Sequence, residues 1–216
     1  MRKKTLSPPL ARMTGLKPSS PLPPTMTDDR RPLPAGSTLL VDLGGVVADN
    51  LPRLCTHLRE EYGHDVDPAD VDDWTYDVPG ADGHVGTVIS ELMTDRPKWY
   101  LGGMAPMDGV ADALESLRER YRVEIATHRL PETHDVSRAW LAEHGIRYDE
   151  FHESVPADKG ALAGDALIDD YHGNVADAIA AGKTGLLMRQ PYSEPGDCDG
   201  AHVVDSWVEV RGLLEG

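Results

Sequence analysis

The chain has 216 residues, of which 40% are hydrophobic and 6% aromatic, and its formal net charge is −16 at pH 7. This length and composition fit one α/β domain with room for a small insertion. No apolar stretch approaches the ~20 residues that a membrane span needs, and the negative charge disfavours nucleic acids and anionic membranes. We therefore expect a soluble, cytoplasmic protein with neither a nucleic acid nor a membrane as its partner.

Residues 1–36 differ in composition from the rest. They are rich in proline, have no amphipathic period and lack the apolar core of a secretory signal, so we expect a disordered tail. Seven Lys or Arg and two Asp give this tail a net charge of +5, which leaves −21 on residues 37–216. A basic arm for nucleic acid is the less favoured interpretation. A start at Met26 would remove most of the tail, so a mis-assigned initiator stays open.

Lysine is scarce beyond the tail, where Lys98, Lys159 and Lys183 are the ones that remain. An excess of Asp and Glu with few lysines resembles the composition of salt-adapted proteins, whose acidic surface stays hydrated while salt screens its self-repulsion. We favour a halophilic protein over an ordinary acidic enzyme.

Hydrophobic periodicity predicts strands that alternate with helices. The expected strands are residues 37–42, 122–127, 150–154, 166–169 and 185–188. The expected helices are residues 51–62, 84–94, 108–121, 133–144 and 174–181, with Thr133 as an N-cap and one more helix starting at Asp67-Pro68-Ala69-Asp70. This alternation predicts a parallel sheet covered by helices.

Residues 50–107 are too many for a single crossover helix, so we expect a helical cap inserted after the first strand. Residues 37–49 and 108–216 would then form the core. Gly102 to Met107 is expected to be the hinge that returns from the cap.

Two predicted strands end in carboxylates. The first runs into Asp42-Leu43-Gly44-Gly45, and the strand at 166–169 ends in Asp169-Asp170. Buried parallel strands deliver such side chains to the carboxyl edge of a sheet, where acids can meet around one divalent cation. Adjacent small residues such as Gly44 and Gly45 let a phosphate approach backbone amides closely.

The order of four elements, Asp42, the strand ending in Thr127, Lys159 and the cluster from Asp165 to Asp170, resembles the haloacid dehalogenase (HAD) superfamily over residues 37–213. Within that superfamily the chain is similar to the 5′(3′)-deoxyribonucleotidase family. The resemblance rests on Leu-Ile-Asp-Asp at 167–170, Gln-Pro-Tyr at 190–192, Glu-Glu-Tyr-Gly at 60–63 and Asp-Trp at 73–74. It implies a HAD-type, Rossmann-like three-layer sandwich and a small phosphorylated substrate, and HAD proteins with small caps often form homodimers.

The resemblance also implies roles for individual residues. Asp42 would be the nucleophile that forms an aspartyl-phosphate, and Mg²⁺ would be held by Asp42, Asp169 and the carbonyl of Gly44. The phosphate would be bound by Gly44, Gly45, Thr127, His128 and Lys159. Asp165 or Asp170 would orient metal-bound waters and the lysine. Trp74, Tyr76, Trp99 and Tyr100 would stack on a nucleobase, although packing of the cap onto the core explains these aromatics equally well.

Gly44 departs from the family pattern. Most phosphatases of the superfamily have a second Asp there, which protonates the leaving oxygen, and a positioned acid is worth roughly 10²–10⁴ in rate. Three interpretations stay open. The substrate has a good leaving group, or Asp49, His128 or His172 substitutes for the acid. The protein catalyses dehalogenase-like or phosphonatase-like chemistry. Alternatively, it is a weak or inactive phosphate-binding protein.

Overall fold

The structure, a computed structural model, describes residues 33–216. Most of the expected tail, including Met26, lies outside the described residues. Within the described range, no helix combines the length and the apolar character needed to cross a membrane.

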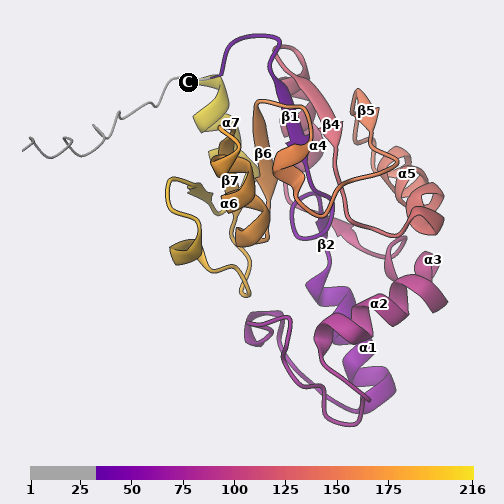
Figure 1. The fold of residues 1–216 in the computed structure, drawn as a ribbon. Helices are drawn as coiled ribbons and strands as arrows, with labels where there is room; N and C mark the ends of the chain where they lie inside the picture. Colours follow the sequence, from indigo (N-terminus) through magenta and orange to yellow (C-terminus); the bar gives the residue numbers. More distant parts are fainter. Residues whose placement is uncertain (1–32) are drawn as a thin grey trace, which may run out of the picture. The chain divides into compact units, whose positions relative to one another are not determined.

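A six-stranded sheet forms the centre of the fold (Figure 1). Its strands lie in the order β5-β4-β1-β6-β7-β8, and every neighbouring pair is parallel. Their bounds are Thr38–Val41 (β1), Arg122–Ile125 (β4), Glu150–Phe151 (β5), Ala166–Asp169 (β6), Thr184–Met188 (β7) and His202–Val204 (β8). The predicted α/β fold with a parallel sheet is confirmed.

Helices cover both faces of this sheet. They are α4 (Val110–Arg118), α5 (His134–Glu143), α6 (His172–Ala180) and α7 (Trp207–Glu215). Successive residues of a strand point to opposite faces. Leu39 accordingly belongs to the core cluster that holds residues of α4, α5 and α7, whereas Leu40 packs with Leu167 and with Ala178 of α6. The result is the expected three-layer sandwich.

The insertion between β1 and β4 is mainly helical. It contains α1 (Leu51–Tyr62), α2 (Val85–Asp95) and α3 (Pro97–Tyr100), which lie together at the lower end of the molecule in Figure 1. A short antiparallel pair of β2 (Ala48–Asp49) and β3 (Ala105–Pro106) closes its base. The sequence did not predict this pair, because strands of two residues are too short to show a period.

Local sequence explains most helix ends. Helix α1 has Pro52 in its first turn and ends at Gly63, whose φ of 64° is the left-handed conformation typical of a helix C-cap. The helix predicted at Asp67 to Asp70 was wrong: residues Pro68–Asp70 form one 3₁₀ turn. Thr133 does precede α5, but its hydroxyl donates to the carbonyl of Leu130, so it does not cap the helix with its side chain.

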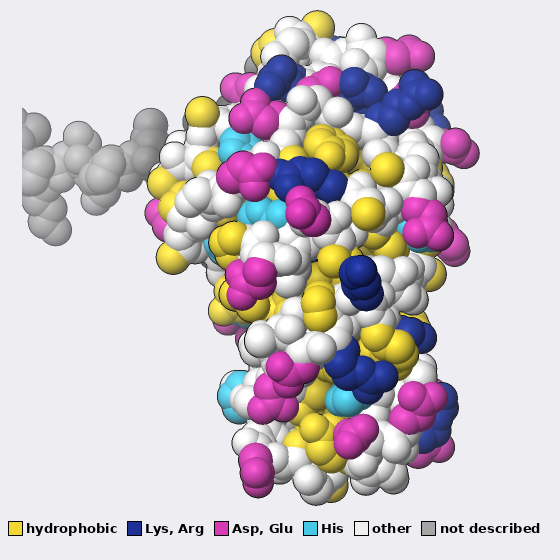
Figure 2. Space-filling view, turned by 90° about the vertical axis from the view of Figure 1, so that its right-hand side faces the viewer, with side chains coloured by type: hydrophobic (Ala, Val, Ile, Leu, Met, Phe, Trp, Pro, Cys, Tyr) yellow, Lys and Arg dark blue, Asp and Glu magenta, His cyan; other side chains and the backbone are white. Residues whose placement is uncertain are grey.

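The sequence also left the end of the chain unassigned, where β8 and α7 complete the sheet and one helical layer. In α7 the hydroxyl of Ser206 accepts a hydrogen bond from the backbone N–H of Glu209, which is an N-cap. On the face shown in Figure 2, acidic side chains are interspersed with Lys and Arg and do not gather into one patch.

Candidate active site

The carboxyl ends of three neighbouring strands converge on one edge of the sheet. Val41 of β1 pairs with Ile125 of β4 on one side and with Ile168 of β6 on the other. Along the chain, β1 is followed by β4 and β5 on one side of it, and the chain then continues with β6 on its other side. The carboxyl edge beside β1 is therefore a topological switch point, the place at which α/β proteins bind ligands. Asp42 follows β1 directly, and Asp169 is the last residue of β6.

Lys159 joins the two acids. Its Nζ lies 2.7 Å from Oδ1 of Asp42 and 2.7 Å from Oδ2 of Asp169. All three residues are buried, with 1% of Lys159, 8% of Asp42 and 1% of Asp169 exposed. Lys159 comes from a 3₁₀ turn, Lys159–Ala161, which packs against α6. We call Asp42, Lys159 and Asp169 the floor of the site.

The electrostatics of the floor are those of buried charges close together. Burial by itself lowers the pKa of Lys159, but the carboxylates of Asp42 and Asp169 outweigh it and raise that pKa above its usual value. Burial, aided by the charge of Asp42, raises the pKa of Asp169 even though Lys159 opposes the change. Burial and the charges of Asp169 and Asp42 raise the pKa of Asp170 well above its usual value.

Further hydrogen bonds hold Asp169 in place. The backbone N–H of Tyr171 donates to Oδ1 at 2.9 Å, and Nδ2 of Asn174 lies 3.1 Å from both carboxylate oxygens. With Lys159, these donors occupy both oxygens of Asp169. The orientation of this carboxylate is therefore fixed before any ligand arrives.

Asp170 contacts the turn after β1. Its Oδ2 accepts a hydrogen bond of 2.5 Å from the hydroxyl of Tyr192. Gly45 has a φ of 67°, and a Cβ there would clash with both Oδ2 of Asp170 and the hydroxyl of Tyr192. Gln190 also donates from Nε2 to the carbonyl of Gly45 at 2.7 Å. Glycine is thus required at position 45 for both its backbone conformation and this close approach.

The segment after β4 supplies the neighbouring wall. Thr127 is buried, and its hydroxyl oxygen accepts from the backbone N–H of Arg129 at 3.3 Å, which leaves the hydroxyl proton free to be donated to a ligand. His128 is exposed, and its Nε2 lies 2.8 Å from the carbonyl of Pro156. Both residues line the same cavity as the floor.

The cavity has a volume of about 220 Å³. Its opposite side, which we call the cap wall, is largely apolar and comes from the insertion; it consists of Trp74, Ile89, Met93, Tyr100, Leu101 and Met104. A neighbouring hollow of about 520 Å³ shares five lining residues with it, namely Trp74, His128, Asp170, Tyr171 and Asn174. The floor therefore opens past Trp74 into a larger space.

The four aromatics expected to form the substrate pocket divide into two pairs. Trp74 and Tyr100 line the cavity. The Tyr76 hydroxyl instead lies 2.6 Å from Nε2 of His64, and Trp99 packs beneath the guanidinium of Arg53, 3.8 Å from its ring centre. Neither Tyr76 nor Trp99 lines the cavity, so for these two the packing interpretation fits their positions.

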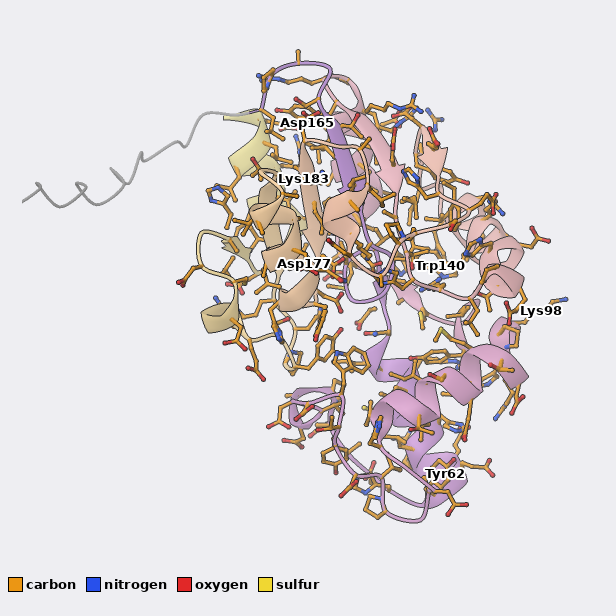
Figure 3. All side chains as sticks on the ribbon, in the orientation of Figure 1. Tyr62, Lys98, Trp140, Asp165, Asp177 and Lys183 are labelled. Atoms are coloured by element: carbon orange, nitrogen blue, oxygen red, sulfur yellow. The ribbon has the colours of Figure 1, made fainter. Side chains whose placement is uncertain are left out.

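Asp165 lies at the wrong edge of the sheet for its expected role. It precedes β6, and its Oδ2 accepts from the backbone N–H of Thr38 at the start of β1. Figure 3 labels it at the end of the sheet remote from α1, α2 and α3. The strand between Asp165 and Asp169 separates them by roughly 13 Å, at about 3.3 Å per residue. Of the two acids expected to support the metal site, Asp170 is the one beside it.

No described residue takes the obvious place of the missing acid. Asp49 and His172 do not line the cavity, and His128, which does, is hydrogen-bonded through Nε2. A Cβ at Gly44 would meet nothing closer than 3.9 Å, where Nδ2 of Asn50 and Oδ2 of Asp42 lie. The backbone therefore has room for a side chain that the sequence lacks.

The donor set suits a hard divalent cation. Mg²⁺ in proteins is usually bound through one or two carboxylates and keeps several waters. Among the described residues no hydrogen bond reaches Oδ2 of Asp42, so this oxygen is free for coordination beside Asp169 and the carbonyl of Gly44. Burial and the negative charge of Asp42 raise the pKa of both Asp169 and Asp170, and a cation would offset the repulsion among these carboxylates.

A second cluster of metal-ligating side chains lies elsewhere. In the described range, the ligand atoms of His172, Glu194 and Asp197 come within 4.8 Å of one another. Two of these residues are exposed and none lines the cavity. At the floor, Lys159 lies between the carboxylates and the carbonyl of Gly44 would add the third ligand.

Among the residues that line the cavity and that sequence reasoning missed, Asn50, Arg129 and Asn174 carry side-chain groups that can contact a phosphorylated ligand. Asn50 is buried, and its Oδ1 has no hydrogen-bond partner in the described part of the chain. Arg129 lies two residues after Thr127, so the polar run that follows the strand could have drawn attention to it. Asn174 is on α6 five residues after Asp169, a spacing that only the fold explains.

The chain also matches a known protein family. The family model of the 5′ nucleotidase, deoxy (pyrimidine), cytosolic type C proteins (NT5C) matches residues 36–215. No curated protein matches the chain.

Several solved structures share the fold. A haloacid dehalogenase-like hydrolase from Streptococcus pneumoniae is 18% identical, with a TM-score of 0.58 over 83% of this chain and 98% of that one. A HAD family hydrolase from Deinococcus radiodurans, with bound phosphate and sodium, is 16% identical, with a TM-score of 0.55 over 83% and 95%. A HAD-hydrolase from Bacillus subtilis, bound to magnesium, is 12% identical, with a TM-score of 0.54 over 84% and 100%.

Proposed function

The chain belongs to the 5′ nucleotidase, deoxy (pyrimidine), cytosolic type C family of HAD-like hydrolases, and from this premise we propose that it is a Mg²⁺-dependent phosphatase. Its substrate is a small phosphomonoester, with a (deoxy)nucleoside 5′- or 3′-monophosphate as the first candidate. The family description and the hollow beside the floor, lined by Trp74 and Tyr171, support a nucleotide.

In this mechanism a carboxylate oxygen of Asp42 attacks phosphorus, and the bond from phosphorus to the ester oxygen breaks. The departing alkoxide takes a proton from water. Water then hydrolyses the aspartyl-phosphate, which releases inorganic phosphate and restores Asp42. Lys159 neutralises charge on the phosphoryl group, and Thr127 donates its hydroxyl to a phosphoryl oxygen.

A bound Mg²⁺ would supply charge neutralisation that lets a carboxylate approach a phosphate dianion. Asp42, Asp169 and the carbonyl of Gly44 are the groups that would hold it. Asp170 and Asn174 keep the surrounding polar groups oriented, because each is itself held by hydrogen bonds.

One observation carries this proposal: Lys159 bridges Asp42 and Asp169 at 2.7 Å on each side, although 117 and 10 residues separate it from them. A buried trio of this kind is costly to assemble, and perturbed groups of this kind cluster at functional sites.

A second candidate is favoured by Gly44. Since Asp49 and His172 do not line the cavity and no acid occupies position 44, the same site could bind phosphate with little turnover. Phosphonatase-like or dehalogenase-like chemistry is a third outcome that an activity panel would reveal.

The test is phosphate release by the full chain from a panel of nucleoside and sugar monophosphates, with Mg²⁺ and in high salt. We expect activity that Asp42→Asn abolishes and that the matched variant Asp165→Asn, at the opposite edge of the sheet, retains. No release from any ester, with inorganic phosphate still bound, would favour the second candidate. Activity that survives Asp42→Asn would refute the proposed nucleophile.

We further propose that the protein works in the cytoplasm, in keeping with the cytosolic type of its family, and that it is salt-adapted. Salt adaptation predicts a melting temperature that rises with KCl because screening relieves the repulsion among acidic groups. Homodimerisation remains a prediction, and light scattering after size-exclusion chromatography tests it.

A further inference from the structure

Arg129 is an unusual residue to find at the edge of the cavity. It is 8% exposed, the same fraction as Asp42 of the floor. It also lines the cavity together with Asp42, Thr127 and Lys159. Arginine is almost never buried unless a partner compensates its charge.

The partners of Arg129 are neutral. Its Nη1 donates to the hydroxyl of Ser137 at 3.1 Å, and its Nη2 lies 3.5 Å from Sδ of Met104, a weak acceptor. Within residues 33–216, no carboxylate forms an ion pair with it. The other N–H donors of the guanidinium have no acceptor among the described residues.

Arg129 forms no ion pair with the floor, although the charge of Asp42 opposes the effect of burial on its pKa. Asp42 and Asp169 are already paired with Lys159 at 2.7 Å, and the charge of Asp42 reaches Arg129 only from beyond ion-pair distance. Burial accordingly lowers the pKa of Arg129. Guanidinium is suited to bind carboxylate or phosphate through two parallel hydrogen bonds.

The backbone presents Arg129 in a fixed position. Its N–H donates to the hydroxyl of Thr127, and its carbonyl lies 3.1 Å from Nε2 of His134 on α5. The guanidinium reaches away from these anchors to Met104, a residue of the cap wall. It therefore lies between Thr127 and the cap wall. In the proposed function, the alcohol part of an ester whose phosphate contacts Asp42 would extend toward this wall.

We propose that Arg129 forms a second anion subsite, so that the substrate is a phosphomonoester whose leaving group carries another anionic group, either a carboxylate or a second phosphate. This inference rests on the proposed function for the position of the transferred phosphate. It narrows the substrate class toward phosphorylated acids and bisphosphates, including nucleoside bisphosphates.

Non-hydrolysable probes test the subsite without turnover. Propylphosphonate and 3-phosphonopropionate have the same length, but the second ends in a carboxylate where the first ends in a methyl group. Ethane-1,2-diyl bisphosphonate replaces the carboxylate with a second phosphonate and so distinguishes the two kinds of anion. We call the two compounds with a second anionic group, 3-phosphonopropionate and the bisphosphonate, the two-anion probes. Calorimetry with Mg²⁺ should show that the wild type binds the tighter of these two probes about 10- to 100-fold more tightly than propylphosphonate, as charge-assisted hydrogen bonds allow.

Variants assign the effect to Arg129. In Arg129→Met, the affinity for the tighter two-anion probe should fall to about that for propylphosphonate. The affinity of this variant for inorganic phosphate should stay within about twofold of the wild-type value. Arg129→Lys should keep part of the preference for the two-anion probe, because it retains the charge and loses the bidentate geometry. Arg53→Met is the matched control: Arg53 donates to the carbonyl of Trp99 and does not line the cavity.

Three results would overturn the inference. One is a wild type that binds the two-anion probe no more tightly than propylphosphonate, a result that does not depend on whether any variant folds. Another is a fall in the affinity of Arg129→Met for inorganic phosphate as large as its fall in affinity for the two-anion probe, which would mean that Arg129 contacts the transferred phosphate. The third is a wild type that binds none of the phosphonates. A protein that shows this preference but hydrolyses no phosphomonoester would refute the proposed activity and leave the subsite standing.

Discussion

The floor and the cap wall face each other across one cavity but are built differently. The floor is polar, and its acids and lysine are held by bonds of 2.7 Å among themselves. The cap wall is mostly apolar, and it comes from an insertion whose first two long helices, α1 and α2, are joined by a long and mostly irregular segment. The register of β1 and β6 and the 3₁₀ turn at Lys159–Ala161 set the floor, whereas the packing of the insertion sets the cap wall.

This difference assigns catalysis to the floor and the choice of substrate to the cap wall. A change in the insertion can alter which molecule fits while the floor keeps its geometry, because no member of the floor belongs to the insertion. Changes at the floor should then affect turnover and stability together. Changes at the cap wall should affect mainly the apparent affinity for substrate.

The largest expected effect comes from removing the cation of the floor. Lys159→Met leaves Asp42 and Asp169 buried without their partner, which should lower the free energy of unfolding of the metal-free protein by about 3–5 kcal/mol. Phosphate release should fall on the order of 10²–10³-fold, since one preorganised charge at the phosphate is lost. Urea unfolding with EDTA and initial rates with Mg²⁺ measure the two effects.

Lys183→Met is the matched control, because Nζ of Lys183 donates to the carbonyl of Gly164 and does not line the cavity. It should cost less than about 1 kcal/mol and leave the rate unchanged. If Lys159→Met proved as stable as this control, the floor would not be the balanced unit that the structure indicates.

The next effect restores a group that the floor lacks. Gly44→Asp places a carboxyl group where a Cβ meets nothing closer than 3.9 Å, so the backbone should accept it. If the missing acid limits the enzyme, kcat for alkyl phosphates should rise by about 10²-fold, at the low end of what general acids contribute. The Asn side chain in Gly44→Asn has nearly the same shape as Asp but no acidic carboxyl proton, so this variant should not raise kcat. An equal gain in both variants would argue against acid catalysis.

A smaller effect concerns pH. Burial and the charges of Asp169 and Asp42 raise the pKa of Asp170 above its ordinary value of 3.8. The folded protein therefore keeps a proton that the unfolded chain has already lost, and the free energy of unfolding should fall as pH rises from about 4 through the raised pKa. Asp170→Asn should flatten this slope in metal-free urea titrations, and Mg²⁺ should flatten it in the wild type. Identical slopes for wild type and variant would contradict the assignment.

Local patterns predicted most of the regular structure. Helix α1 was predicted at its observed bounds from the spacing of its apolar residues, and in the structure Leu54 and Leu58 are buried and Gly63 is its C-cap. Strand β6 was likewise predicted at 166–169 from its uninterrupted apolar run. Asp67-Pro68-Ala69-Asp70 has the composition of a helix start, but no apolar face follows it, so one turn forms and ends. The β2–β3 pair depends on a contact across more than 50 residues and had no local signal.

The site was predictable where it depends on strand ends. Asp42 and Asp169 come together because the parallel strands β1 and β6 place their ends at one edge, and the 3₁₀ turn Lys159–Ala161 brings Lys159 between them. Asp165 belongs to the same acidic cluster in sequence, but a strand of four residues carries it to the other edge. Arg129 stands in the polar run that follows β4, but nothing in the sequence shows that this residue is buried without a carboxylate partner.

The smallest expected effect distinguishes two aromatic residues of the insertion. Trp74 lines the cavity with its ring 4.4 Å from that of Tyr192, whereas Trp99 lies between Arg53 and Arg96 outside the cavity. Trp74→Ala should raise KM for the best substrate about 5- to 10-fold with little change in kcat, because stacking on a ligand contributes roughly 1–3 kcal/mol. Trp99→Ala should leave KM unchanged and lower only the melting temperature. If both variants raised KM equally, selection would depend on the insertion as a whole, because local contact at the cap wall would not account for it.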